Sequence, residues 1–382
     1  MNFRRNKFYY SLKKGFGSAK YIRKYNYSFQ SVDIPYDPIV VLCTARTKDD
    51  PMLVAMSFSR HLYFTADESF LTNGGEKKSL RYKYSPIPIF SASNNTEACL
   101  EIIRRVKAGH SICIFPEGKR SGDGTTGEIK KSVAELLKRL CVCVVTYKID
   151  GAYMINPAWA KHMRRGKTYG HTVNIYSPEN VKRMSVERLY EAIVSDLSED
   201  AIASVRETQS VYKGENLAEG IENQLCICPA CKRLNTLSSK GNSIICECHA
   251  GGEIDADGRI TGFPFDNVRD WTRWQQSMIE SLPFMSEEKE LAFNENCELY
   301  EIRRDHSSEL VCKGRLSASN VSFKISSFEV IFDKILRADV NFDGNLTFAT
   351  KKAGRSHYEI RCEGGYCAQM YLDILKRYKS SK

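Results

Sequence analysis

The sequence predicts an α/β domain with a mostly parallel sheet, followed by a small cysteine-rich module and a β-rich C-terminal domain. Three observations lead to this prediction. Strand-length apolar runs alternate with amphipathic helical patterns up to about residue 180. Two close groups of cysteines follow between residues 226 and 248. Beyond residue 288, short and partly alternating apolar runs succeed one another with turns between them, and one helical stripe closes the sequence.

Length and composition limit the possible classes of protein. The 382 residues are enough for two or three domains. A formal net charge of +10 favours an anionic partner, either nucleic acid or an acidic membrane surface. The 14 cysteines are scattered or paired, and we see neither a signal peptide nor an apolar run of about 18 residues. We therefore expect a protein of the reducing cytosol, and neither a secreted disulfide scaffold nor a membrane-spanning chain.

Residues 1–30 are predicted to form a basic amphipathic N-terminal segment. The segment is rich in lysine and arginine and holds no acid, while Phe8, Leu12 and Phe16 repeat at helical spacing. Such a segment can lie on an anionic membrane with its apolar side inserted. The alternative is an amphipathic helix that packs on its own domain.

The α/β domain is predicted over residues 31–220. Apolar runs of strand length lie at 38–43, 61–64, 112–114 and 141–149, and helical stripes lie at 94–109 and 129–140. The prolines of 86–90 confine that short extended piece to an edge or a loop. Ligands of such domains gather at the carboxyl ends of the strands. The loop after 112–114 is therefore the first candidate site.

That loop has the sequence Phe115-Pro116-Glu117-Gly118-Lys119-Arg120-Ser121. Arg120 and Lys119 could bind a phosphate, and Gly118 would let the backbone come close to it. Glu117 could hold a substrate hydroxyl or orient the basic residues. The alternative is a strand-end turn with solvated charges.

The order of these motifs resembles the glycerophospholipid acyltransferases, in particular the lysophosphatidic acid acyltransferases. The resemblance covers about residues 35–180 and is carried by Asp50-Pro51, Tyr63-Phe64, the Pro-Ile-Pro piece, loop 115–121 and the segment from Val144 to Tyr153. It implies transfer of an acyl group from acyl-CoA or acyl carrier protein to a lysophospholipid. It also implies substrate binding by the loop residues Phe115, Pro116, Glu117, Gly118, Arg120 and Ser121.

The sequence departs from this family at the general base. The resemblance implies a histidine that takes the proton of the attacking hydroxyl, and an aspartate five residues later that orients the ring. Asp50 is present, but Ala45 stands at the expected histidine. His61 lies six residues before Asp67, in a predicted strand, and is a poor replacement. A lysophospholipid acyltransferase with an altered base and a catalytically impaired, lipid-binding or regulatory relative therefore both stay open.

Residues 223–260 are predicted to form a zinc ribbon. Cys228 and Cys231 are separated by 14 residues from Cys246 and Cys248, which is the ligand spacing of a structural zinc site. The second pair is one residue tighter than usual, so Cys226 or His249 could replace a ligand; packing without a metal is the alternative. A zinc-dependent nucleic-acid binder is a minor alternative, because this segment is poor in lysine and arginine.

The C-terminal part is predicted to contain a linker helix over 261–287 and a β-rich domain with a terminal helix over 288–382. Trp271 and Trp274 are expected to anchor the linker helix in a core. The strands followed by one helix resemble pleckstrin-homology-like domains. We expect the whole protein to be cytoplasmic and peripheral on the inner face of the membrane, bound to lysophospholipid and acyl thioester.

Overall fold

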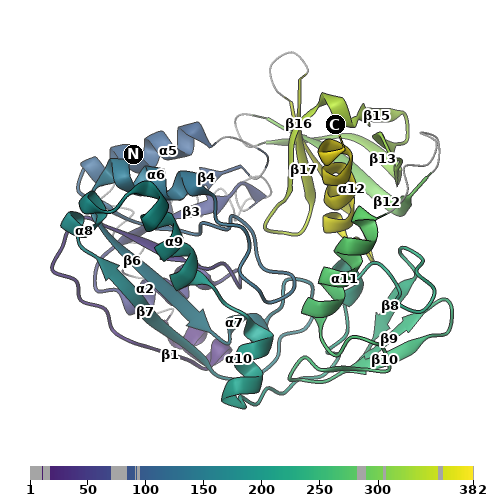
Figure 1. The fold of residues 1–382 in the computed structure, drawn as a ribbon, viewed down its shortest axis with the longest axis horizontal. Helices are drawn as coiled ribbons and strands as arrows, with labels where there is room; N and C mark the ends of the chain where they lie inside the picture. Colours follow the sequence, from purple (N-terminus) through teal and green to yellow (C-terminus); the bar gives the residue numbers. More distant parts are fainter. Residues whose placement is uncertain are drawn as a thin grey trace. The chain divides into compact units, whose positions relative to one another are not determined.

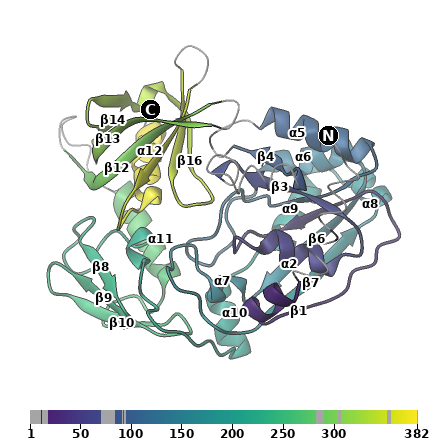
Figure 2. The same ribbon diagram turned by 180° about the vertical axis from the view of Figure 1, so that it is seen from behind.

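The structure is a computed structural model that describes residues 11, 18–69, 84–90, 92, 95–281, 290–303, 307–351 and 356–381. The chain divides into two compact units, shown in Figures 1 and 2. Unit 1 comprises residues 1–90, 94–158 and 165–212, and unit 2 comprises 91–93, 159–164 and 213–382. Within the described ranges, no helix is both long enough and apolar enough to span a bilayer.

Unit 1 is built on one seven-stranded sheet with the order β1-β7-β6-β2-β5-β3-β4. Its strands are β1 (Tyr27–Phe29), β2 (Ile39–Cys43), β3 (Leu62–Asp67), β4 (Ile87–Ile89), β5 (Ser111–Ile114), β6 (Cys143–Asp150) and β7 (Thr168–Tyr176). All neighbouring strands are parallel except β6 and β7. The predicted mostly parallel α/β sheet is thus confirmed, with one reversal of direction that makes it a mixed sheet.

Helices cover both faces of this sheet. They are α2 (Asp50–Ser57), α5 (Thr96–Lys107), α6 (Lys131–Leu140), α7 (Ala152–Ile155), α8 (Pro178–Arg183), α9 (Val186–Leu197) and α10 (Ala201–Thr208). Helices α5, α6, α8 and α9 share one apolar core with the sheet, and α2 lies on the opposite face (Figures 1 and 2). Strands β2 and β5 are buried on both faces, which explains why they are apolar at nearly every position.

The described part of the N-terminal segment is tied to unit 1. Residues 18–25 are helical, and Tyr25 at the end of this helix is buried. The Tyr25 hydroxyl and the Lys24 ammonium both donate to Asp49 Oδ2, at 2.9 and 2.6 Å. The end of the segment therefore packs on its own domain. The apolar stripe of Phe8, Leu12 and Phe16 lies outside the described residues.

Unit 2 begins with a small antiparallel ribbon followed by a helix. The ribbon consists of η1 (Ile221–Asn223), β8 (Leu237–Lys240), β9 (Ser243–Cys246), β10 (Gly251–Ile254) and β11 (Ile260–Thr261), and the helix is α11 (Val268–Glu280). Asn267 caps α11, since its side chain accepts from the Asp270 N–H at 2.8 Å. Trp271 is fully buried and donates its indole N–H to the Ile227 carbonyl at 2.9 Å. Trp271 therefore anchors the helix in the ribbon core.

The rest of unit 2 is a seven-stranded antiparallel sheet with a terminal helix. Its elements are β12 (Ala292–Ile302), β13 (Ser308–Ala318), β14 (Ser322–Ile325), β15 (Phe328–Ile331), η2 (Phe332–Lys334), β16 (Ile335–Val340), β17 (Leu346–Thr350), β18 (His357–Cys362) and α12 (Ala368–Ser380). Met370, Ile374 and Tyr378 of α12 are buried in its core. Cys297 and Cys362, opposite each other in β12 and β18, form a disulfide that we did not expect. The likeness to pleckstrin-homology-like domains stays a prediction.

Candidate functional site

Two loops meet at the carboxyl edge of the unit 1 sheet. Strands β2 and β5 are parallel neighbours with Leu42 opposite Ile114, so the loops that follow them start side by side. The Ser121 N–H lies 3.4 Å from the Ala45 carbonyl, to which it donates. The fold thus brings loop 44–50, with Ala45 and Asp50, against the predicted phosphate loop 115–121.

A buried cation of loop 44–50, Arg46, contacts the second loop. Its side chain is 0% exposed and forms ion pairs with Glu117 at 3.1 Å and Glu199 at 3.0 Å. It also donates a hydrogen bond to Thr126 Oγ1 at 3.0 Å. Burial by itself would lower the pKa of Arg46, but the two carboxylates raise it above its usual value. The guanidinium therefore stays charged and joins three segments of unit 1.

Glu117 is committed to contacts within the protein. Its side chain is 1% exposed, and besides Arg46 its carboxylate accepts from two backbone N–H groups. These are the N–H of Ala45 at 3.1 Å and that of Gly127 at 2.6 Å. These contacts commit Glu117 to Arg46 and to the backbone, whereas the sequence predicted that Glu117 orients Lys119 and Arg120 or binds a substrate hydroxyl.

Asp50 holds the backbone of its own loop. One carboxylate oxygen accepts from the N–H groups of Arg46 at 2.6 Å and Thr47 at 2.9 Å, and the other accepts from the Thr47 hydroxyl at 2.5 Å. Burial raises the pKa of Asp50 to about 6, although the hydrogen bonds from Thr47 act in the opposite direction. Asp50 and Ala45 are each 1% exposed. Asp50 is thus a buried carboxylate that fixes the backbone of its loop. Ala45, five residues before it, carries only a methyl group.

Of the remaining loop residues, Arg120 and Ser121 make contacts within the protein, whereas the backbone at Gly118 is open. Arg120 donates to the carbonyls of Arg46 at 3.0 Å and Asn156 at 2.6 Å. Ser121 Oγ accepts from the Gly124 N–H at 2.9 Å and closes the turn. Gly118 has a φ of +72°, and a Cβ added there would meet nothing within 4 Å. The backbone at Gly118 is therefore open to a ligand.

The aromatic start of the loop packs on strand β3. The ring of Phe115 stacks on Phe64 with centroids 6.4 Å apart, and the Phe115 N–H donates to Thr65 Oγ1 at 3.3 Å. Pro116 follows and is partly exposed. These contacts fix the point at which the loop leaves the sheet.

Sequence reasoning missed Arg46, Thr126 and Glu199. Thr126 and Glu199 lie 80 and 153 residues from Arg46 in the sequence, so no local pattern connects them. One signal was available: Arg46 closely follows the unbroken apolar run Ile39–Cys43, which predicts a buried strand. A cation in such a position needs a buried acid as partner.

The structure also places His61, the histidine considered as a replacement for the missing base, and His171. His61 precedes β3, a strand parallel to β5, and so lies at the amino edge of the sheet, opposite the two loops. His171 bonds through Nε2 to Asp150 Oδ2 at 3.0 Å. The hydrogen bond to Asp150, and a further one to the Thr172 backbone, raise the pKa of His171. These contacts favour the protonated ring, which is the wrong form for a base.

The His171–Asp150 pair makes a pH-dependent contribution to stability. Because the pKa of His171 is raised by folding, the contribution is full below the unfolded value of about 6.5 and is lost as the pH rises through the folded value. We expect His171→Gln to lower the free energy of unfolding at about pH 5.5 and to have little effect at about pH 9. Urea unfolding at both pH values measures this, and an equal loss at both would contradict it.

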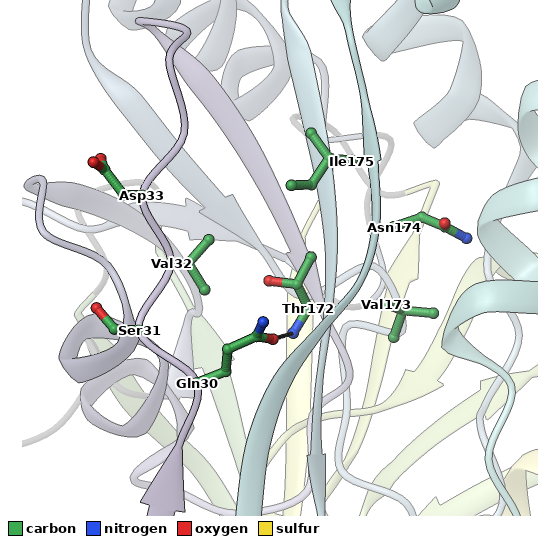
Figure 3. A pocket seen from close by; sticks show the side chains of 8 residues that line it. All are labelled: Gln30, Ser31, Val32, Asp33, Thr172, Val173, Asn174 and Ile175. Atoms are coloured by element: carbon green, nitrogen blue, oxygen red, sulfur yellow. Dashed lines mark hydrogen bonds between the residues drawn. The ribbon is translucent and has the colours of Figure 1, made fainter.

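A separate pocket lies beside β1 and β7 (Figure 3). It is lined by residues 30–33 and 172–175, and none of these belongs to the two loops. Gln30 and Val32 point toward β7, and the Thr172 N–H donates to Gln30 Oε1 at 3.4 Å (Figure 3). This pocket does not include any predicted site residue.

Four cysteines gather in the ribbon of unit 2. The sulfur atoms of Cys228, Cys231, Cys246 and Cys248 all lie within 4.8 Å of one another and could hold a metal ion. Cys226 and His249, the two predicted substitutes, are not members of this group. The four cysteines that the sequence predicted as metal ligands thus lie close together.

Comparison with known proteins agrees with the architecture of unit 1. The family model described as "Acyltransferase" matches residues 24–150, which hold both loops of the candidate site. The resemblance to the acyltransferases that the sequence predicted is therefore confirmed for this part of the chain.

Among solved structures, the chain is similar to the 1-acyl-sn-glycerophosphate (LPA) acyltransferase PlsC from Thermotoga maritima. The two share 20% identity with a TM-score of 0.44, over 56% of this chain and 86% of that chain. No curated protein matches the chain.

Proposed function

We propose that unit 1 transfers an acyl group from an acyl thioester to the hydroxyl of lysophosphatidic acid or a related lysophospholipid, as a step of phospholipid biosynthesis. The observation that carries this proposal is the acyltransferase match over residues 24–150, which contains both loops at the carboxyl edge of the sheet. That edge is where α/β sheets bind ligands. The acyl donor is acyl-CoA or acyl carrier protein.

In this proposal the phosphate of the acceptor lies against loop 115–121. The positive charge of Arg120 and the open backbone at Gly118 support this placement. The acceptor hydroxyl oxygen attacks the thioester carbonyl, its proton leaves, and the thiol departs as the new ester forms. Because Ala45 cannot accept the proton, water or the Asp50 carboxylate takes it in this proposal, and the acceleration comes mainly from positioning of the two substrates. We therefore expect slow transfer.

A second candidate function is a non-catalytic lipid-binding or regulatory protein. Two observations favour it. Ala45 stands at the position where the family has its base, and Glu117 is bonded to Arg46 and to two backbone N–H groups. Both candidates use the same lipid site. They differ in whether a thioester is consumed.

We also propose that the protein is cytoplasmic and works on the inner membrane surface. On the helix of residues 18–25, Lys20, Arg23 and Lys24 are exposed and lie on one side at helical spacing, so this side is basic. Lys24 and Tyr25 connect the helix to Asp49 of the site loop. A membrane-bound helix would thus hold the site close to its lipid substrate.

The test is a transfer assay with lysophosphatidic acid in anionic vesicles. Labelled acyl-CoA and labelled acyl carrier protein are supplied in separate reactions, and glycerol 3-phosphate replaces the lysophospholipid as a control acceptor. We expect slow formation of diacylated product that depends on the lysophospholipid and on one donor. Binding to the vesicles without product would favour the second candidate. If the protein neither binds the vesicles nor forms product, both candidates are contradicted.

A further inference from the structure

We propose that Cys228, Cys231, Cys246 and Cys248 bind one zinc ion, and that this ion holds together the ribbon core around Trp271. The proposal concerns unit 2 and is independent of acyl transfer. It assigns the ligands, the structural role of the metal and the part of the protein that depends on it.

The distances between the sulfur atoms fit a tetrahedral metal. Cys228 and Cys248 have their sulfurs 3.9 Å apart, and those of Cys231 and Cys246 are 3.7 Å apart. Four thiolates about 2.3 Å from a central zinc ion lie about 3.8 Å from one another. A disulfide would need about 2.05 Å. These two separations therefore match ligands that share an ion.

A hydrogen-bonded turn and a left-handed residue follow both cysteine pairs, despite their different spacing. The residue after the second cysteine of each pair is left-handed, with φ of +59° at Lys232 and +69° at His249. A turn closes each pair, because the Lys232 N–H donates to the Cys228 carbonyl at 2.8 Å and the His249 N–H to the Cys246 carbonyl at 2.9 Å. The four sulfurs that these turns carry lie within 4.8 Å of one another. The shorter second pair is thus accommodated without a substitute ligand.

Hydrogen bonds to sulfur also support thiolate ligands. The Cys248 N–H donates to Cys246 Sγ at 3.5 Å, and the Thr236 hydroxyl lies 3.2 Å from the same sulfur. Donors near sulfur offset the negative charge that four thiolates bring to one ion. Such donors are expected around a metal ligand.

The structure distinguishes the ligands from the neighbouring candidates. Cys226 is buried in the core that includes the C-terminal sheet, and its N–H donates to Gln275 Oε1 at 3.0 Å. His249 is exposed and stands outside the group of four sulfurs. Because all four ligands come from the protein, the site has no open position and is structural.

The ribbon depends on such an ion because its own core is small. Its strands are two to four residues long. Cys228 and Cys246 lie in one apolar cluster with Trp159 and Trp271. Small domains with few apolar side chains commonly need a metal to fold. Removing the ion should therefore loosen the packing of both tryptophans.

The effect should extend along α11. Trp271 lies near the start of this helix, while Trp274 and Ile279 further along pack in the core that holds α12. The three tryptophans of the chain are Trp159, Trp271 and Trp274, and all belong to unit 2. Intrinsic tryptophan fluorescence therefore reports on this unit and not on unit 1.

The experiment uses the full chain, purified without added metal. Elemental analysis should find one zinc per chain, and cobalt exchanged into the site should give the absorption of a tetrahedral four-thiolate complex. A strong chelator should remove the ion and shift tryptophan emission to longer wavelength, and added zinc should reverse the shift. Folded protein without metal, or chelation that leaves the emission unchanged, would overturn the proposal.

Variants test the ligand set. Cys228→Ser and Cys246→Ser should each lose the metal, whereas Cys141→Ser in unit 1 and His249→Asn should keep one zinc per chain; asparagine tolerates the left-handed backbone at position 249. If a ligand variant fails to fold, the chelation and re-addition series on the unchanged chain decides. Loss of metal from His249→Asn would show that the assigned ligands are wrong.

Discussion

Replacing Ala45 with histidine should raise kcat for acyl transfer to lysophosphatidic acid by about a hundredfold to ten-thousandfold, which is the usual contribution of a positioned general base. Residue 45 lies five residues before Asp50, and Asp50 carries a buried carboxylate that could orient the new ring. The KM for the lysophospholipid should change little, since a base acts mainly in the transition state. Initial rates at saturating and limiting lipid separate kcat from KM.

The matched control for this variant is Ala45→Asn. Asparagine adds polar volume at the same position but has no basic nitrogen. We expect the asparagine variant to stay at or below the rate of the unchanged chain. Equal rates for the histidine and asparagine variants would contradict the assignment of position 45 as the place of the missing base.

Replacing Arg46 with methionine should lower the free energy of unfolding of unit 1 by about 3–5 kcal/mol, the typical cost of removing one partner from a buried ion pair. Glu117 and Glu199 would be left as buried carboxylates without their cation. Urea unfolding followed by far-ultraviolet circular dichroism gives the change. Exchange of the amide hydrogens of Ala45 and Gly127, which bond to Glu117, should become faster.

Lys131→Met is the matched control for Arg46→Met. Lys131 also forms an ion pair, with Glu187 at 2.7 Å, but both side chains are exposed to solvent. Pairs of this kind contribute little to stability. If both variants unfold at the same urea concentration, the Arg46 network does not hold the two loops together.

The strands and helices of unit 1 were predictable because their burial leaves a strong pattern. The core strands read as unbroken apolar runs, since helices cover both of their faces. The reversal at β7 was not predictable, because Thr168–Tyr176 mixes polar and apolar residues and carries no sign of direction. The pairing of β7 with β6 is set by the whole sheet.

The candidate site was predictable where it depends on motif order, and not where it depends on distant partners. Parallel neighbouring strands explain why Asp50 and loop 115–121 come together. The link from Arg46 to Glu199 spans 153 residues and could not be read from a local pattern. In the ribbon, the spacing of the cysteines in the sequence indicated the four ligands. That Cys226 is not a ligand became clear only from the structure, in which it packs in the core of the C-terminal sheet.

The most direct test of the central claim, that the two loops of unit 1 bind a lysophospholipid, is hydrogen exchange with bound lipid. Exchange is measured with lysophosphatidic acid and with monoacylglycerol, which has the same acyl chain and no phosphate. We predict slower exchange in residues 44–50 and 115–127 with lysophosphatidic acid, and a smaller effect with monoacylglycerol. No protection of these loops, or equal protection by both lipids, would contradict the account.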